Sequence, residues 1–203
     1  MNIIEKANMQ SFHEHRLNEF GDLSVKSLGW KNTMSQQKRF EILIQIGDLN
    51  GTNILDLGCG YGDLKPFLDE HFENFTYIGV EHMPEFFRIA QENYGDLKDT
   101  YFVQGDFSKM TFEDVDYILA SGALGYKCQN EIYYWETIAH MIKSANKGVA
   151  FNMLDETKFP EHNLLKAHNK SKVVDFCSKL CNHVQVIDNY LEDDFTVFAL
   201  KEK

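Results

Sequence analysis

The stretch of residues 53–63, Asn-Ile-Leu-Asp-Leu-Gly-Cys-Gly-Tyr-Gly-Asp, constrains the fold of this chain more than any other. It opens as a short apolar run, which is typical of a buried parallel strand. Gly58, Gly60 and Gly62 follow, and glycines let a backbone turn sharply and approach a ligand without a Cβ in the way. The next segment has helical spacing, and free N–H groups at a helix start attract anions. The stretch therefore predicts a strand, a ligand-binding loop and a helix.

The rest of the chain alternates strand-like apolar runs with amphipathic segments. Further strands are predicted at 75–80, 101–105, 115–120 and 149–154, a closing hairpin at 184–190 and 195–200, and helices at 3–20, 35–47, 130–145 and 161–181. This alternation indicates an α/β fold. With 203 residues, 43% of them hydrophobic, one domain with a full core is expected.

Charge and cysteine content narrow the partners and the compartment. The net charge of -11 opposes a nucleic-acid substrate, because that affinity comes largely from Lys and Arg, although a local basic patch stays open. No signal-like or membrane-spanning apolar stretch is evident. Four cysteines without a paired pattern favour a reducing compartment. The prediction is a cytoplasmic protein without a membrane partner, and the sequence is silent on oligomeric state.

The glycine spacing, together with the acid before it, carries a family resemblance. A dinucleotide site would show G-x-G-x-x-G, whereas Asp56 and the glycines read D-x-G-x-G-x-G. This pattern resembles motif I of the class I S-adenosylmethionine-dependent methyltransferases. The resemblance extends over 53–203 by element order and implies a Rossmann-like, doubly wound, seven-stranded sheet, mostly parallel with an antiparallel last strand. It implies S-adenosylmethionine as cofactor, a methyltransferase domain at 51–203, and an additional helical lid or extension at 1–50.

Acidic residues at two further strand ends complete the expected cofactor site. Glu81 lies 25 residues after Asp56 (81 minus 56), where a carboxylate is placed to accept both ribose hydroxyls. The resemblance implies that Asp106 binds the adenine amino group and that Phe107 lies against the ring. The predicted cofactor-binding set is Asp56, Gly58, Cys59, Gly60, Glu81, His82, Asp106, Phe107, Ser121, Gly122, Trp30 and Arg39.

Two members of that set come from the N-terminal segment, whose elements often cap the cofactor pocket in the resembling family. Trp30, Gln37 and Arg39 are candidates for that role. Arg39 could hold the methionyl carboxylate in a charge-assisted fork. The alternative, an exposed arginine on a solvated helix face, stays open.

The loop after the fourth strand narrows the acceptor by what it lacks. It contains no Asn-Pro-Pro-Tyr or Asp-Pro-Pro-Tyr run, and Ser121 stands where the metal-dependent catechol-type enzymes carry an acid. The resemblance therefore implies metal-independent transfer to a small molecule by in-line displacement, in which alignment is the main task. No general base is identified. Tyr126, Asn152 and His162 are candidate substrate contacts by position alone.

Histidines and cysteines elsewhere are interpreted as structural. His13 and His15 lie two apart, so on a helix they point in different directions and do not form a metal pair. Cys177 and Cys181 are better explained as buried thiols than as zinc ligands.

Three other functions remain open. A cofactor-binding sensor or partner subunit without turnover would show the same cofactor motifs. A protein methyltransferase would differ only in its acceptor. A nicotinamide dehydrogenase is opposed by the glycine spacing.

Overall fold

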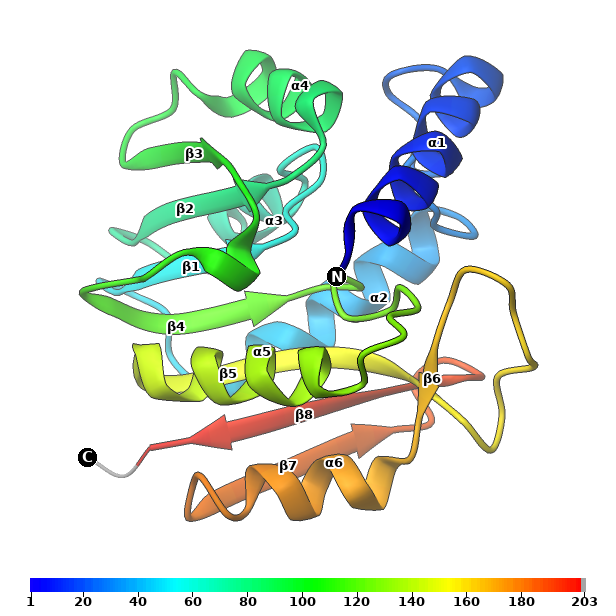
Figure 1. Ribbon diagram of the computed structural model, residues 1–203. Helices are drawn as coiled ribbons and strands as arrows, with labels where there is room; N and C mark the ends of the chain where they lie inside the picture. Colours follow the sequence, from blue (N-terminus) through cyan, green and yellow to red (C-terminus); the bar gives the residue numbers. More distant parts are fainter. Residues whose placement is uncertain (202–203) are drawn as a thin grey trace.

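One mixed sheet runs through the middle of the molecule in the computed structural model, which describes residues 1–201 (Figure 1). The strand order is β3-β2-β1-β4-β5-β8-β7, and a short β6 pairs with the end of β5. The strands are β1 Asn53–Leu57, β2 Thr76–Glu81, β3 Thr100–Gln104, β4 Val115–Ala120, β5 Ala145–Asp155, β6 Ala167–His168, β7 His183–Asp188 and β8 Asp194–Leu200. β8 runs antiparallel to both β5 and β7, and the other strand pairs are parallel. The predicted Rossmann-like doubly wound fold is confirmed, with the two-residue β6 as an eighth strand.

Helices cover both faces of this sheet. They are α1 Ile3–Phe20, α2 Thr33–Leu43, α3 Leu64–Asp69, α4 Pro84–Tyr94, α5 Ile132–Ser144 and α6 Lys170–Cys177, with 3-10 turns at Ile44–Ile46 and Phe107–Lys109. The α1 helix begins with a reciprocal cap, in which the Asn2 side chain accepts from Glu5 N–H and Glu5 accepts from Asn2 N–H. None of the helices in residues 1–201 is both long enough and apolar enough to span a membrane.

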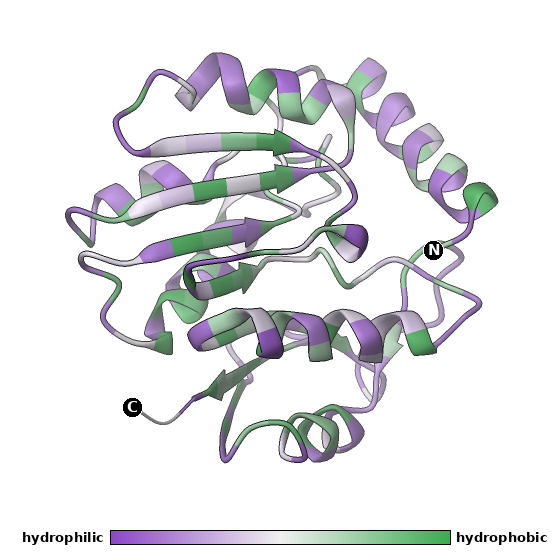
Figure 2. Cartoon of the chain, turned by 60° about the vertical axis from the view of Figure 1, so that its left-hand side comes forward, coloured by the Kyte–Doolittle hydropathy of each residue, from purple (hydrophilic) through white to green (hydrophobic). Residues whose placement is uncertain are grey.

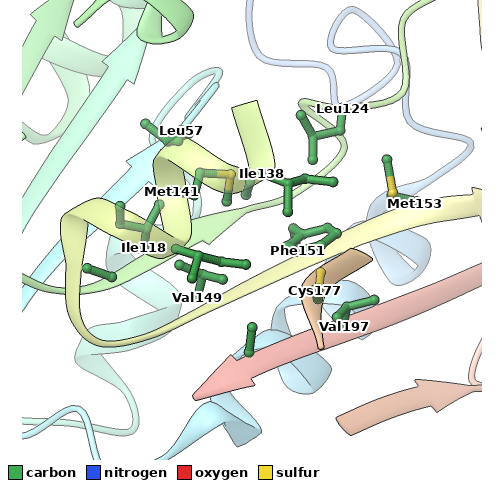
Figure 3. Close-up of a cluster of buried hydrophobic side chains, with 14 of the residues drawn as sticks. Leu57, Ile118, Leu124, Ile138, Met141, Val149, Phe151, Met153, Cys177 and Val197 are labelled. Carbon is green, nitrogen blue, oxygen red and sulfur yellow. The ribbon is translucent and has the colours of Figure 1, made fainter. Parts of the chain in front are cut away.

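The alternation of side chains along the strands divides the core into two layers. On one face, α5 and α6 cover Leu57, Ile118 and Phe151, as the close-up in Figure 3 shows for Ile138, Met141 and Cys177. On the other face, α2 and α3 cover a second buried cluster that includes Leu43, Leu68 and Tyr77. In Figure 2 the strands carry hydrophobic colour, whereas α1 is largely hydrophilic. Apolar side chains on both faces of the strands are thus buried under helices, which places the sheet at the centre of the molecule.

One predicted helix is wrong over most of its length. The apolar spacing predicts a helix over residues 161–181, but the helix in that range covers only Lys170–Cys177. The preceding segment is extended because its backbone pairs with the loop after β4: Lys127 N–H donates to Leu164 O (2.7 Å) and Lys166 N–H donates to Gly125 O (2.8 Å). The helix then begins after Asn169, whose side chain caps Lys172 N–H.

Candidate functional site

A cavity of about 600 Å³ opens at the carboxyl ends of β1, β2, β4 and β5. This is the edge at which doubly wound sheets bind ligands. The α1 helix lies beside this edge (Figure 1), and Lys6, Met9, Phe12 and His13 of α1 contribute to the cavity wall. The site is therefore enclosed by the sheet edge on one side and by the N-terminal segment on the other.

Every residue of the predicted cofactor set lines this cavity. Those residues are Asp56, Gly58, Cys59, Gly60, Glu81, His82, Asp106, Phe107, Ser121, Gly122, Trp30 and Arg39. Of the substrate candidates, Tyr126 and Asn152 also line it. His162 does not; its Nδ1 accepts from Leu164 N–H and Leu165 N–H (3.2 and 3.0 Å) in an exposed turn. The predicted cofactor residues, Tyr126 and Asn152 therefore lie around one cavity. What each of them binds is a proposal.

The glycine loop after β1 needs glycine at specific positions. Gly58 and Gly60 have φ values of +71° and +58°, which residues with a Cβ rarely adopt. A Cβ on Gly58 would also stand 2.8 Å from the Cβ of Ala123. Gly58 N–H and Cys59 N–H both donate to Val80 O (2.8 and 3.1 Å), which holds the loop against β2.

Glu81, at the end of β2, is the buried acid of this site. Its Oε2 accepts from Gly60 N–H (2.9 Å) and its Oε1 accepts from Met83 N–H (2.7 Å). Burial raises the pKa of Glu81 to about 7, although these amide hydrogen bonds act in the opposite direction. An ionised carboxylate has about four lone-pair sites, so Glu81 keeps capacity for two further donors.

Asp56 is buried below the loop and has a different partner. Its Oδ2 accepts from the Tyr77 hydroxyl at 2.7 Å. Burial raises the pKa of Asp56 to about 7, and the nearby Glu81 adds to the shift. Asp56 thus supports the loop from the side of the sheet, at the same time as it contributes to the cavity floor.

Asp106 connects the sheet edge to α1. Its carboxylate forms an ion pair with Lys6 and accepts from Ser108 N–H (3.1 Å) and the Ser108 hydroxyl (2.6 Å). Partial burial raises the pKa of Asp106, but these contacts outweigh it and hold the pKa at about 2. Glu5 adds a second link, since its Oε1 accepts from Gln129 N–H (2.6 Å). Two acidic contacts therefore fix the start of α1 over the cavity.

Arg39 is buried and paired, so the interpretation of an arginine on a solvated face is wrong. Its side chain is 11% exposed and its Nε forms an ion pair with Asp194 at the start of β8. The guanidinium carbon lies 4.6 Å from the centroid of the Trp30 ring. This stacking is a cation–π contact, and it orients the indole along the cavity wall. The sequence carries no sign of this partnership, because Arg39 and Asp194 meet only through the fold.

Trp30 packs closely over Gly122, and this contact leads to a prediction. Gly122 has a φ of +74°, and an added Cβ would stand 2.5 Å from Trp30 Cη2. We expect Gly122→Ala to lower the free energy of unfolding by about 2–4 kcal/mol, because backbone strain and displacement of the indole add together. Urea unfolding measures this. Gly51→Ala is the matched control: its φ is +64° but nothing lies within 4 Å of its Cβ position, so only the strain remains. Equal losses in both variants would contradict the packing argument.

Asn152 Nδ2 and Ser121 Oγ line the site, are buried, and have no hydrogen-bond partner among residues 1–201. Asn152 Oδ1 accepts from Gly122 N–H at 2.8 Å, which fixes the orientation of the amide. Since buried polar groups are normally paired, these two atoms are available to hydrogen-bond with a polar ligand in the cavity.

His13 is a site residue that sequence reasoning missed. It is 3% exposed, its Nδ1 lies 2.9 Å from Ser27 O, and its Nε2 lies 2.5 Å from the Tyr126 hydroxyl. The sequence spacing bears only on whether His13 and His15 form a metal pair. They do not, because His15 is exposed whereas His13 is buried. Spacing within one helix carries no information about a partner 113 residues away.

Neither the histidines nor the cysteines gather into a metal centre in the described part of the chain. Residues 1–201 contain no group of three or more His, Cys, Asp or Glu side chains that could hold a metal ion. Cys177 and Cys181 are free and buried, and Cys181 Sγ contacts Leu200 O. The interpretation of both as buried thiols agrees with this position.

Comparison with known proteins agrees with the fold and with the motif. Residues 54–148 match a family model described as a methyltransferase domain. A Mycobacterium tuberculosis protein named as a putative methyltransferase is 26% identical over 159 residues, which is 73% of this chain and 93% of that one. Trans-aconitate 2-methyltransferase of Klebsiella pneumoniae is 24% identical over 127 residues, covering 62% of this chain and 48% of the enzyme.

A solved structure shares the fold. Magnesium protoporphyrin IX methyltransferase from Synechocystis, determined with bound S-adenosylhomocysteine, superposes with a TM-score of 0.66 at 14% identity, over 83% of each chain. Together these matches confirm the predicted resemblance to the class I S-adenosylmethionine-dependent methyltransferases.

Proposed function

We propose that this protein transfers a methyl group from S-adenosylmethionine to a small-molecule acceptor, without a metal ion. The observation that carries the proposal is the pairing of a buried carboxylate, Glu81, with the glycine loop at the floor of one enclosed cavity. Glu81 has room for two hydroxyl donors, and Gly58 and Gly60 of the loop line the same cavity. These residues fit a nucleoside with a free ribose.

The cavity and its neighbours support a small acceptor. A volume of about 600 Å³ lies within the range of small-molecule sites. The Klebsiella relative is named for trans-aconitate and the Synechocystis structure for a porphyrin, which are both small molecules. The net charge of -11 opposes a nucleic-acid acceptor. A cytoplasmic location is part of the proposal, and the four buried free thiols are consistent with it.

In this proposal the chain's own residues bind, orient and exclude water. Glu81 holds the ribose hydroxyls, Asp106 takes the adenine amino group, and the unpaired Asn152 Nδ2 and Ser121 Oγ supply polar contacts near the β4 end. The bound cofactor supplies an electrophilic methyl group on a sulfonium. Within residues 1–50, α1 acts as the cover, because Lys6 and Glu5 tie it to the sheet edge, whereas α2 packs on one face of the sheet. Exclusion of water then favours transfer to the aligned acceptor.

Thermal unfolding with added ligands, followed by a turnover screen, tests the proposal. S-adenosylmethionine and S-adenosylhomocysteine at about 100 times their dissociation constants should each add about 2.7 kcal/mol to stability, whereas NAD should add nothing. Release of S-adenosylhomocysteine is then measured against a library of hydroxyl, amine, carboxylate and thiol metabolites. Stabilisation by NAD alone would contradict the cofactor assignment. Stabilisation by the adenosyl ligands without turnover on any class would favour the sensor function, and turnover on a peptide library alone would favour a protein methyltransferase.

A further inference from the structure

We propose that the His13–Tyr126 pair forms the proton-accepting site of this enzyme, with Tyr126 as the residue that touches the acceptor, so that the acceptor is a hydroxyl or amine that arrives protonated. This inference rests on the proposed function, because it assigns a role at the acceptor end of the same cavity. The inference goes beyond the proposed function because it names a general base and a chemical class of acceptor. Both residues line the cavity that holds Glu81 and the glycine loop.

The hydrogen bonds of His13 fix its tautomer. Nδ1 lies 2.9 Å from Ser27 O, and a carbonyl oxygen can only accept, so Nδ1 carries the proton. Nε2 then has a lone pair, and the Tyr126 hydroxyl at 2.5 Å must donate to it. The tyrosine oxygen keeps its own lone pairs for a further donor. The arrangement is therefore a hydroxyl whose proton is already directed at a base.

The surroundings keep this pair neutral before reaction. Burial lowers the pKa of His13; the hydrogen bond to Ser27 O opposes this shift, and the charge of Arg16 on the same helix adds to it. Burial also raises the pKa of Tyr126, with a further contribution from Glu81 of β2. His13 is thus an unprotonated imidazole at neutral pH and can take up a proton.

Rigid neighbours hold both members in place. Phe12 and Phe86 meet His13 edge to face, with centroids 5.1 and 4.9 Å from the imidazole. The backbone of Tyr126 is fixed by the Tyr134 hydroxyl, which donates to Tyr126 O at 2.7 Å, and by a bridge to Leu165. A base positioned in this way on fixed elements is what general base catalysis requires.

The proton balance of the step is simple. The acceptor X–H bond breaks and its proton goes to the Tyr126 oxygen, while the Tyr126 proton goes to His13 Nε2. The freed electron pair on X forms the bond to the methyl carbon, and the electrons of the carbon–sulfur bond remain on sulfur. The proton ends on the imidazolium, which is stabilised by its Nδ1–H bond to Ser27 O. A carboxylate acceptor arrives deprotonated and would not need this pair.

An optical probe tests the pair without knowledge of the natural acceptor. 4-Nitrophenol is a small hydroxyl compound whose phenolate absorbs visible light, and it is titrated in the presence of saturating S-adenosylhomocysteine. In the wild type we expect the proton of the bound probe to pass to the pair, because the imidazolium that forms stabilises the phenolate beside it, and the apparent pKa of the probe should fall by about one unit. Tyr126→Phe, which keeps the ring and removes the hydroxyl, should abolish this shift, and His13→Gln should abolish it through the loss of the imidazole base.

Controls separate this proposal from a structural role and from the proposed function. His15→Gln changes an exposed histidine of the same helix and should leave the ionisation unchanged. A purely structural His13–Tyr126 contact would alter melting temperature but not the probe spectrum. Lack of probe ionisation in the wild type, or equal ionisation in wild type and Tyr126→Phe, overturns the proposal. If S-adenosylhomocysteine itself fails to stabilise the wild type, it is the cofactor assignment that fails, and the melt shows this independently of the probe.

Discussion

Glu81→Ala is expected to remove the stabilisation that S-adenosylhomocysteine gives to the wild type. The carboxylate would accept both ribose hydroxyls, and a hydrogen bond to a charged group contributes about 1.5–3 kcal/mol. Glu81 also accepts from Gly60 N–H, so its loss frees the glycine loop as well. Together these effects should weaken cofactor binding by about 3–5 kcal/mol, or roughly 100- to 5,000-fold. Thermal unfolding and calorimetric titration with the ligand measure it.

The matched control is Glu70→Ala, which removes an exposed carboxylate at the end of α3. It should leave both the ligand-free melting temperature and the ligand-induced shift unchanged. A Glu81→Ala variant that still gains the full shift would show that the ligand lies elsewhere in the cavity. The ligand-free melt is compared first, so that a folding defect is not mistaken for a binding defect.

The same residue predicts the pH dependence of binding. Burial raises the pKa of Glu81 to about 7, and ribose hydroxyls donate best to the ionised form. Affinity should therefore fall as pH drops below about 7, and binding near neutral pH should release a proton, which titration in two buffers of different ionisation enthalpy detects. Asp56 is the control, because its Oδ2 already accepts from Tyr77. Asp56→Asn should keep the pH dependence of affinity, and a pH-independent wild type would contradict the prediction.

For the ligand-free fold, the sign of the Glu81 contribution is opposite to that for binding. The folded pKa of about 7 lies above the ordinary value of 4.5, so the unfolded chain loses its proton first as pH rises. The contribution of Glu81 to stability is therefore greatest below about pH 4.5 and is lost as pH rises through about 7. Glu81 therefore lowers the stability of the ligand-free protein at neutral pH. Strongly shifted pKa values of this kind are common among residues of functional sites.

The sequence is sufficient to predict the arrangement of residues wherever that arrangement depends on a local pattern. The strand before Gly58, the glycines themselves and the acid at the end of β2 form one contiguous unit, so their spacing alone indicated their arrangement. The α1 helix was also predicted at its observed bounds, Ile3–Phe20, because its start and its terminating Gly21 are encoded locally. Parallel strands then bring Glu81, Asp106 and Ser121 to one edge, whichever details of packing apply.

Sequence reasoning failed where a residue's partner is distant along the chain. The segment before Lys170 has helical spacing of apolar residues, yet its backbone pairs with Gly125 and Lys127, and this tertiary pairing overrides the local preference. The spacing of His13 invites comparison with a neighbour on the same helix, whereas its partner is Tyr126. Hydrophobic periodicity predicts neither partner, because it indicates which face of a helix or strand is buried and not which residues pack against that face.

Arg39→Met is expected to cause a larger loss of stability than Gly122→Ala. Asp194 is 2% exposed at its side chain and Arg39 is 11% exposed, so the ion pair is withdrawn from water. Burial raises the pKa of Asp194, and the attraction of Arg39 opposes that shift. Removing the guanidinium leaves a buried carboxylate without its countercharge, which costs about 3–5 kcal/mol. Urea unfolding at neutral pH measures the loss.

Two further variants show whether the missing countercharge is the cause. Arg88→Met removes an arginine whose pairs with Glu85 and Glu92 lie on the exposed face of α4, and it should leave the stability nearly unchanged. The double variant Arg39→Met with Asp194→Asn removes the buried charge as well, and should recover most of the loss. The deficit of the single variant should also shrink at low pH, where Asp194 takes up a proton. A double variant as unstable as Arg39→Met would instead assign the effect to the stacking of Arg39 on Trp30, and the ion pair would then contribute little.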